Sequence, residues 1–292
     1  MQKLRALLAD VVDGGTLLTV QPGGNHGDSL IYLGFDKLLE STDIDRVGLD
    51  SGRFRYDAPA DFPSTDLVTD VRWLYHQWQY ARHRLFGDVS AIYIHGGGNF
   101  NDMWKVGIDC YRAAGRYFDC PIVVGPQSCQ FERTDPTSIF ERIPNETHFF
   151  CRERYSYDII ADATRSCDHV DVYLEDDTAL YLEKEDLPVR SYDEDYALVA
   201  MRMDQDSSEP MIQQDIRAPV TVSDISKMKE TFEEWVNTTA QASHVFTDRL
   251  HVAILGAILD KPVTWYNTGY HKNQGVYEYS LANEADLDFP SL

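Results

Sequence analysis

The sequence predicts an α/β protein built from two consecutive βα series. Short apolar runs of strand length alternate along the chain with longer amphipathic segments, which is the pattern of βα units and a parallel sheet. The length of 292 residues fits two domains of roughly 100 to 200 residues each. A hydrophobic fraction of 43%, with 12% aromatic residues, is too apolar for a disordered chain. No fixed-period repeat is visible, which argues against solenoids and propellers.

The first βα series occupies residues 1–185. Its strands are expected where short apolar runs lie between turn signals: Thr16–Val20, Arg46–Leu49, Ala91–His95, Pro121–Gly125, His148–Cys151 and Val170–Leu174. Its helices are expected where apolar residues recur at helical spacing: Asp28–Glu40, Asp70–Phe86, Met103–Phe118 and Arg154–Ala163.

The second, shorter series occupies residues 195–292 and follows a charged linker, Glu183–Asp195, that contains Pro188. The same criteria predict strands and helices in this order: Tyr196–Arg202, helix Asp224–Thr239, His244–Phe246, helix Asp248–Leu259, Pro262–Trp265 and helix Lys272–Leu281. We therefore predict two Rossmann-like lobes that face each other across a cleft. Ligands of such sheets bind where loops follow the carboxyl ends of strands.

The charge balance argues against several classes of partner. With 26 Lys and Arg against 48 Asp and Glu, the formal charge is −22, and such a chain is not attracted to nucleic acid or to anionic lipid. An anionic substrate would need a local cluster of Arg, Lys and His to overcome the surrounding field. No export signal or membrane-spanning run is visible, and the five cysteines show no Cys-x-x-Cys spacing, so we expect a cytoplasmic protein with reduced thiols.

The loop Gln21–Asp28 is the first with a chemical signature, because it runs from a predicted strand into a helix. Its glycines let the backbone approach a ligand, and a helix N-terminus offers unpaired N–H groups to a phosphate or to sugar hydroxyls. The Lys-Ser/Thr pair of a P-loop is missing. The alternative is a tight turn in which Asp28 is the helix N-cap.

Two more glycine loops follow predicted strands. The loop His95–Phe100 contains three consecutive glycines and resembles an esterase oxyanion hole, but no Gly-x-Ser-x-Gly nucleophile exists in the sequence. The loop Gly125–Ser128 follows the next predicted strand. Both loops imply close approach of another group to the backbone.

The segment Thr247–Gly256 is the most specific of the loops. Here Asp248 can cap a helix, while Arg249 and His251 lie at its positive end and form the anion pocket that the charge balance requires. Arg202 and Lys272 also follow predicted strands and are expected to converge on this pocket. The alternative is structural, with Arg249 salt-bridged and His251 satisfied in the core.

Together these loops resemble the polysaccharide pyruvyl transferase family, in the family's order and over about residues 16–282. The motifs that carry the resemblance are Gly-Asn-x-Gly-Asp, Gly-Gly-Gly, Gly-x-Gln-Ser and Thr-Asp-Arg-Leu-His, here Gly24–Asp28, Gly96–Gly98, Gly125–Ser128 and Thr247–His251. The last loop departs from the family, because Asn267-Thr-Gly-Tyr-His-Lys272 stands where Asp-Asn-Ser-Tyr-Gly-Lys is frequent.

The resemblance implies a fold similar to that of two-Rossmann (GT-B-like) glycosyltransferases, with the acceptor side in the first lobe and the donor side in the second. It implies transfer of the enolpyruvyl group of phosphoenolpyruvate to a sugar of a cell-surface or exopolysaccharide precursor, free or lipid-linked, as a pyruvate ketal. The implied donor-binding residues are Arg202, Arg249, His251 and Lys272, and the implied catalytic residues are His251 and Asp28. The acceptor and backbone loops would contribute Gly24, Asn25, Gly27, Gly96, Gly97, Gly98, Asn99, Gln127 and Ser128.

The implied chemistry requires no cofactor and no metal. Phosphoenolpyruvate is a substrate, and Arg and Lys side chains would neutralise its phosphate and carboxylate. The Asp-x-Asp pairs at Asp43 and Asp286 have the spacing of metal-dependent glycosyltransferases, but such pairs arise by chance in an acidic chain. Two alternatives stay open: a sugar-nucleotide-dependent glycosyltransferase of the same architecture, and a non-catalytic glycan- or nucleotide-binding protein.

Overall fold

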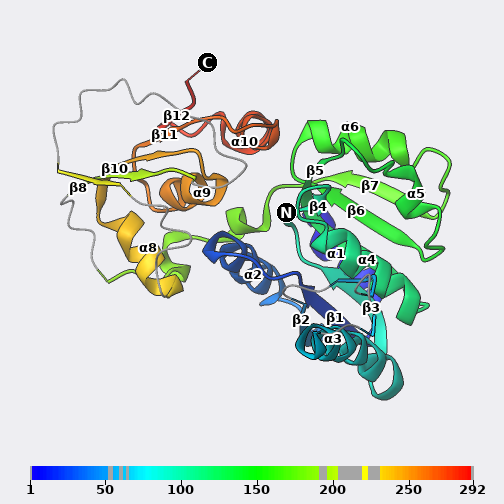
Figure 1. Ribbon diagram of the computed structural model, residues 1–292. Coiled ribbons are helices and arrows are strands. Elements are labelled where there is room, and N and C mark those ends of the chain that lie inside the picture. Colours follow the sequence, from blue (N-terminus) through cyan, green and yellow to red (C-terminus); the bar gives the residue numbers. More distant parts are fainter. Residues whose placement is uncertain are drawn as a thin grey trace. The chain divides into compact units, whose positions relative to one another are not determined.

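The computed structural model describes residues 2–51, 55–58, 62–63, 66–190, 196–202, 219–222 and 231–290. The chain divides into two compact units, each with its own parallel sheet (Figure 1). The first unit comprises residues 1–23 and 38–176, and the second comprises residues 24–37 and 177–292. The predicted α/β class is confirmed. The prediction that the two units face a common cleft stays a prediction.

The first unit is built on a parallel sheet in the order β2-β1-β3-β5-β6-β7, with β4 paired to β5. Its strands are β1 Thr16–Gln21, β2 Asp45–Asp50, β3 Val89–Ile94, β4 Gly97–Asn101, β5 Ile122–Gln130, β6 Thr147–Cys151 and β7 Val170–Leu174. Its helices are α1 Gln2–Val12, α3 Leu67–Phe86, α4 Val106–Tyr117, α5 Thr137–Phe140 and α6 Arg154–Ala163. Aromatic rings centred on Phe100 fill the core, and strands β3 and β5 are buried along most of their length, as central parallel strands are.

The second unit is built on a parallel sheet in the order β12-β11-β10-β8-β9. Its elements after residue 177 are η1 Thr178–Tyr181, η2 Lys184–Asp186, β8 Tyr196–Ala200, β9 Val220–Val222, α8 Phe232–Ala240, β10 Ala242–Thr247, α9 Leu250–Ile258, β11 Val263–Trp265, α10 Lys272–Val276, the π-turn Tyr277–Leu281 and β12 Leu287–Asp288. Helix α9 is buried along most of its length, which explains its nearly uninterrupted apolar sequence.

Helix α2, His26–Leu39, lies in the second unit although the preceding strand, β1, lies in the first. Leu30 belongs to the second unit's core, and the Thr178 hydroxyl donates to the carbonyl of Ile31 at 3.0 Å. Gly34 touches the backbone of Thr178 so closely that a Cβ there would lie 1.9 Å from its carbonyl oxygen. The predicted ranges 1–185 and 195–292 therefore differ from the structure at residues 24–37 and at the boundary near residue 177.

Several predicted elements need correction. The Gly125–Ser128 loop is the middle of strand β5, and Gly97–Asn99 belongs to strand β4, so glycine and proline did not mark loops there. Helix α1 was not predicted. The predicted helix over Asp224–Thr239 begins at Phe232 in the described part, and its residues 224–230 lie outside the described residues, as do residues 191–195 of the predicted linker.

Candidate active site

The carboxyl edge of the second sheet collects most of the predicted donor-binding residues. Strands β8, β10 and β11 are neighbours and run parallel, so the segments that follow them emerge at one edge. Arg202 follows β8, Arg249 and His251 follow β10, and Lys272 begins the helix after β11. Arg249 and Lys272 are only 5% exposed, so both cations are held inside the unit.

The segment after β10 is anchored to β8 by side chains. The Thr247 hydroxyl donates to the carbonyl of Ala200 at 2.6 Å and accepts from the N–H of Arg249 at 2.9 Å. Oδ1 of Asp248 accepts from the N–H of Arg202 at 2.7 Å. The predicted role of Asp248 as a helix cap is therefore wrong: its carboxyl ties the ends of β8 and β10 together, and α9 begins at Leu250 with no side-chain cap.

Burial raises the pKa of the fully buried Asp248 carboxyl to about 6, although Arg202 and Arg249 act in the opposite direction. A carboxyl whose pKa is raised in the folded state stabilises the protein when protonated. That contribution is complete below the ordinary value of 3.8 and is lost as the pH rises through about 6. The shift corresponds to about 3 kcal/mol.

We accordingly expect Asp248→Asn to be more stable relative to the parent at pH 7 than at pH 4, because the amide keeps the acceptor for Arg202 without the buried charge. Urea unfolding of both proteins across this range measures the difference, with the exposed Asp158→Asn as the control for loss of one acidic group. Parallel stability curves for Asp248→Asn and the parent would contradict the assignment.

His251 contacts a carboxylate inside the second unit. Its Nε2 lies 3.3 Å from Oδ2 of Asp177, whose side chain is 1% exposed. The other oxygen of Asp177 accepts from the N–H of Ala179 at 2.9 Å and caps the short helix η1. The carboxylate is thus fixed by the backbone and fixes the imidazole in turn. An ionised carboxylate only accepts hydrogen bonds, so it selects the ring form with the proton on Nε2.

Another edge of the His251 ring faces the first turn of α2. A Cβ built on Gly27 would lie 2.5 Å from Nδ1 of His251, closer than real side chains approach. Gly27 is buried and has an ordinary negative φ, so it is glycine for lack of space and not for backbone conformation. The Gly24–Asp28 loop, predicted to belong to the first lobe, therefore lies with His251 in the second unit.

Asn25 and Asp28 form the start of α2 between them. Oδ1 of Asn25 accepts from the N–H of Gly27 at 2.8 Å, and Oδ2 of Asp28 accepts from the N–H of Asn25 at 2.8 Å. The two bonds tie Asn25, which precedes the first residue of α2, to the first turn of the helix, in which Asp28 is the third residue. The N-cap alternative for Asp28 is therefore wrong, and its carboxyl has a structural partner at the position predicted to be catalytic. Gly24 leaves room for that carboxyl, with a φ of 147°.

Lys272 is the first residue of α10 and follows the segment after β11. Its Nζ lies 4.7 Å from the centroid of the Tyr270 ring, a cation–π contact. The neighbouring Asn273 is fully buried and donates to the carbonyls of Asp248 and Tyr266, at 2.7 and 2.9 Å, so it joins the ends of β10 and β11.

Sequence reasoning missed Asp177 and Asn273. Asp177 is the third of three acidic residues after β7 and precedes Thr-Ala, which is an N-cap signal, but nothing local connects it with a histidine 74 positions away. Asn273 follows the predicted Lys272 directly and has the amide that bridges two strand ends, yet a buried asparagine has no sequence signature of its own.

The remaining predicted residues lie in the first unit, directly after β3, in β4 and in the middle of β5. Gly96 and Gly97 are buried, Gly98 is half-buried, and Gly97 has a φ of 132° that favours glycine. The Gln127 amide donates to the carbonyl of His95 at 3.1 Å and to Oδ1 of Asn99 at 3.3 Å. Oε1 of Gln127 is buried without a hydrogen-bond partner among the described residues. The Gln127 amide thus holds β5 to the segment from His95 to Asn99.

Ser128 leads to a buried charge that sequence reasoning also missed. Its hydroxyl accepts from Nε of Arg152 at 2.8 Å, and Arg152, directly after β6, is 2% exposed. The next residue, Glu153, is fully buried and caps α6 through the N–H of Ser156. A buried Arg-Glu pair after a strand is costly unless it is satisfied, and such groups concentrate at functional sites.

For the glycine triplet we expect Gly96→Ala to destabilise the first unit. The new Cβ would lie 2.3 Å from the carbonyl oxygen of Pro126, which is backbone and cannot swing away. Overpacking of this kind costs about 1–3 kcal/mol. Urea unfolding measures the loss, with Gly48→Ala as control because the nearest atom to its Cβ is 3.9 Å away. If Gly96→Ala and Gly48→Ala are equally stable, Gly96 does not pack as closely against the Pro126 carbonyl as described.

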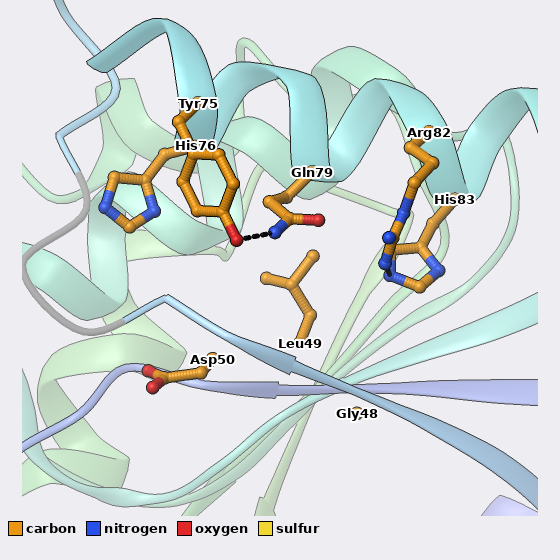
Figure 2. Close-up of a pocket in the computed structure, with 8 residues that line it drawn as sticks. All are labelled: Gly48, Leu49, Asp50, Tyr75, His76, Gln79, Arg82 and His83. Atoms are coloured by element: carbon orange, nitrogen blue, oxygen red, sulfur yellow. Dashed lines mark hydrogen bonds between the residues drawn. The ribbon is translucent and has the colours of Figure 1, made fainter. Parts of the chain in front are cut away.

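A cavity of about 240 Å³ lies apart from these residues, between β2 and α3 of the first unit. Figure 2 shows His76 and His83 on the α3 side and Leu49 and Asp50 on the strand side. It contains none of the predicted site residues. Across the described ranges, no group of three or more His, Cys, Asp or Glu side chains is arranged to hold a metal ion.

The comparison with protein families decides the identity of the chain. The family described as "Polysaccharide pyruvyl transferase" matches residues 25–270, which includes Gly27, Asp177, Arg249 and His251. The chain belongs to this family. No curated protein matches the sequence.

Solved structures place this pyruvyl transferase family member in a known fold. It is similar to "a functional uncharacterized protein KP1_0663" from Klebsiella pneumoniae, with a TM-score of 0.71 and 20% identity over 99% of this chain and 98% of that one. The match to a periplasmic component of an ABC-type sugar transport system from Hahella chejuensis covers 93% of this chain and 85% of that one, with 10% identity and a TM-score of 0.25. In the described part of the chain, no helix has the length and apolarity to cross a membrane.

Proposed function

We propose that this member of the polysaccharide pyruvyl transferase family uses phosphoenolpyruvate as donor and forms a pyruvate ketal on two hydroxyls of a sugar. The observation that carries the proposal is the His251 ring, held at Nε2 by Asp177 and packed along its Nδ1 edge against Gly27, where no side chain intervenes. One imidazole fixed in this way is suited to carry a proton to and from substrate.

The cations at the same sheet edge suit the charges of the donor. Arg249 and Arg202 flank the buried Asp248, and Lys272 follows the adjacent strand, in a chain that has 48 acidic and 26 basic residues. Guanidinium groups bind carboxylate and phosphate through two parallel hydrogen bonds, which positions the donor as well as neutralising it. The surrounding negative charge makes such a cluster a requirement for any anionic donor.

In the proposed reaction the doubly protonated ring of His251 gives a proton to the methylene carbon of phosphoenolpyruvate, which becomes a methyl group, and the neutral imidazole remains. The resulting cationic centre at C2 is attacked by one sugar hydroxyl, whose proton returns to the imidazole. The bond from C2 to the phosphate oxygen then breaks, and phosphate leaves with its charge neutralised by Arg202 and Arg249. The second hydroxyl attacks C2 and closes the ketal, and its proton leaves with the phosphate. The sum is one donor and one diol giving one ketal and one phosphate.

We further propose that the second unit is the donor side and the first unit the acceptor side, as in two-Rossmann glycosyltransferases. The buried loop of Gly96–Asn99 with Gln127, Ser128 and Arg152 supplies amide, hydroxyl and guanidinium groups that suit sugar hydroxyls. The acceptor would be a sugar of a cell-surface or exopolysaccharide precursor, free or lipid-linked.

The direct test is incubation with phosphoenolpyruvate and a panel of sugar acceptors, with phosphate release and ketal formation as readouts. A thermal-shift measurement adds the donor class, because only a ligand of the folded protein raises its melting temperature. Stabilisation by phosphoenolpyruvate supports the proposal. Stabilisation by a nucleotide-sugar in its place would assign the protein to the glycosyltransferase alternative.

We expect Arg249→Lys to weaken phosphoenolpyruvate binding although the charge is kept, because an ammonium group cannot form the two-pronged contact. Losing one charge-assisted hydrogen bond costs about 1.5–3 kcal/mol, and calorimetric titration of the donor measures it. The matched control is Arg116→Lys, an exposed arginine of the first unit that stacks on Tyr56. Unchanged donor affinity in Arg249→Lys would remove Arg249 from the anion pocket.

A further inference from the structure

Helix α3 carries an apolar face that the first unit leaves exposed. Seven of the thirteen large hydrophobic side chains that are exposed in the described part of the chain lie on this one helix: Leu67, Val68, Val71, Leu74, Tyr75, Trp78 and Leu85. Their exposure ranges from 49% to 71%. Single exposed apolar residues need no explanation, but a continuous patch of this kind marks an interaction surface.

The spacing of these residues is that of a coiled-coil seam. Positions separated alternately by four and three residues are all apolar, and we call them the α3 stripe: Leu67, Val71, Leu74, Trp78, Ala81 and Leu85. This alternation keeps one narrow line of side chains facing a partner helix. Val68 and Tyr75 widen the line on one side.

The other face of α3 is already used within the first unit. Asp70, Gln77, Tyr80 and His83 are between 0% and 8% exposed. Figure 2 shows His76 and His83 on the side of α3 that borders the cavity beside β2. Polar side chains of α3 thus lie partly inside its own unit beside Tyr80, while most of the large apolar side chains of α3 lie outside it. An ordinary surface helix buries its apolar side chains instead.

The α3 stripe is symmetric about position 76. If a second α3 runs antiparallel to the first with the two-fold axis at this position, Leu67 meets Leu85 of the second copy and Leu74 meets its Trp78. Val71 meets Ala81, which completes the line with apolar pairs only. Self-complementarity of one patch is what an isologous two-fold dimer requires.

The charges favour the same antiparallel alignment. The exposed Asp66 caps the start of α3, while the exposed Arg82 and Arg84, the latter also paired with Asp119, lie in its last turns. Antiparallel pairing sets the acidic start of each helix beside the basic end of the other, and it also opposes the two helix dipoles. A parallel pair would set like charges together.

We propose that α3 is a homodimerisation helix, which pairs antiparallel with the α3 of a second copy of this chain through the α3 stripe. An anionic membrane surface fits less well. Helices that lie on anionic membranes bind through basic residues, and although Arg72, Arg82 and Arg84 of α3 are exposed, the net charge of −22 opposes approach of the whole chain to an anionic surface.

Sedimentation equilibrium over a concentration series tests the proposal on the full chain. We expect a monomer–dimer equilibrium that strengthens with salt, because the two copies repel each other through their net charge. Leu74→Glu places two new charges near the two-fold axis and should raise the dimer dissociation constant at least about 100-fold. The control is Tyr155→Glu, which adds the same charge at an exposed aromatic residue of α6 and should leave the dimer unchanged.

Cysteine cross-linking tests the alignment. The double variant Val71→Cys with Ala81→Cys should form a disulfide-linked dimer under mild oxidation, whereas Val71→Cys alone should not, since its two copies would be about 15 Å apart along the helix axis. Linking by Val71→Cys alone would show a parallel pair. A chain that stays monomeric at every concentration, or that floats with phosphatidylglycerol vesicles through Leu74 and Trp78, would overturn the proposal.

Discussion

Replacing His251 with glutamine is expected to lower the rate of pyruvyl transfer by about 10²–10⁴-fold, the usual loss for a general acid, while donor binding persists. Glutamine is close in size, and its amide N–H can replace Nε2 as the donor to Asp177, but it cannot deliver a proton. The side chain of His251 is 14% exposed, so the substitution buries no new group. A melting curve, a donor titration and a single-turnover rate on one preparation separate stability, binding and chemistry.

The partner variant Asp177→Asn serves as the companion to that measurement. It keeps the cap on η1, since the amide oxygen still accepts from Ala179, but it can no longer act as a negatively charged acceptor for His251. We expect a smaller rate loss than for His251→Gln and an altered pH–rate profile. If His251→Gln instead lowers melting temperature, binding and rate together, the histidine is structural. A stable variant with the parent's rate would remove it from the mechanism.

Gly27→Ala should lose activity by roughly 10²-fold, because misplacing a catalytic group by about 1 Å costs that much. The added methyl would lie 2.5 Å from Nδ1 of His251 and 2.8 Å from its Cβ, so the ring must move relative to Asp177. Stability should change little, since alanine favours the helix start by up to about 1 kcal/mol over glycine and offsets the crowding.

Single-turnover rates and melting curves of Gly27→Ala beside Gly48→Ala make this prediction specific. Both changes add one methyl to a glycine, but at Gly48 the nearest atom is 3.9 Å from the new carbon. We expect a parent-like rate for Gly48→Ala. Full activity in Gly27→Ala would mean that the space beside Nδ1 is not needed for the reaction.

Local pattern predicted the elements well where one helix or strand had one role. Helix α6 and strand β7 have the predicted bounds, Arg154–Ala163 and Val170–Leu174. The glycine-rich stretches failed because Gly125 and Pro126 are turn formers by composition, yet here β5 runs on through them, pairing with β3 up to Val124 and with β4 from Gln127. Strand pairing overrode the local preference, and pairing depends on residues remote in sequence.

For the candidate site, the cations and His251 were predicted from their places after strands, but their partners were not. The contact of His251 with Asp177 joins positions 74 apart, and its contact with Gly27 joins elements in different predicted lobes. The apolar spacing in α2 shows that one face of the helix is buried. It does not show which of the two sheets covers that face. Asp248 shows the same limit, because its cap signal is real but the N–H of Arg202 competes for its carboxyl.

The position of α2 affects how the second unit folds during synthesis on the ribosome. Gly27 and Leu30 are made more than 220 residues before His251 and its helix, which at about 5–20 residues per second is roughly 10 to 45 seconds. During that interval the apolar side of α2 has no core to enter, although the sheet around it in sequence can already form. The core of the second unit therefore forms only after two segments far apart in sequence have both been made. In a nascent chain that stops before β10, the apolar side of α2 stays exposed to chaperones and to the α2 helices of other nascent chains.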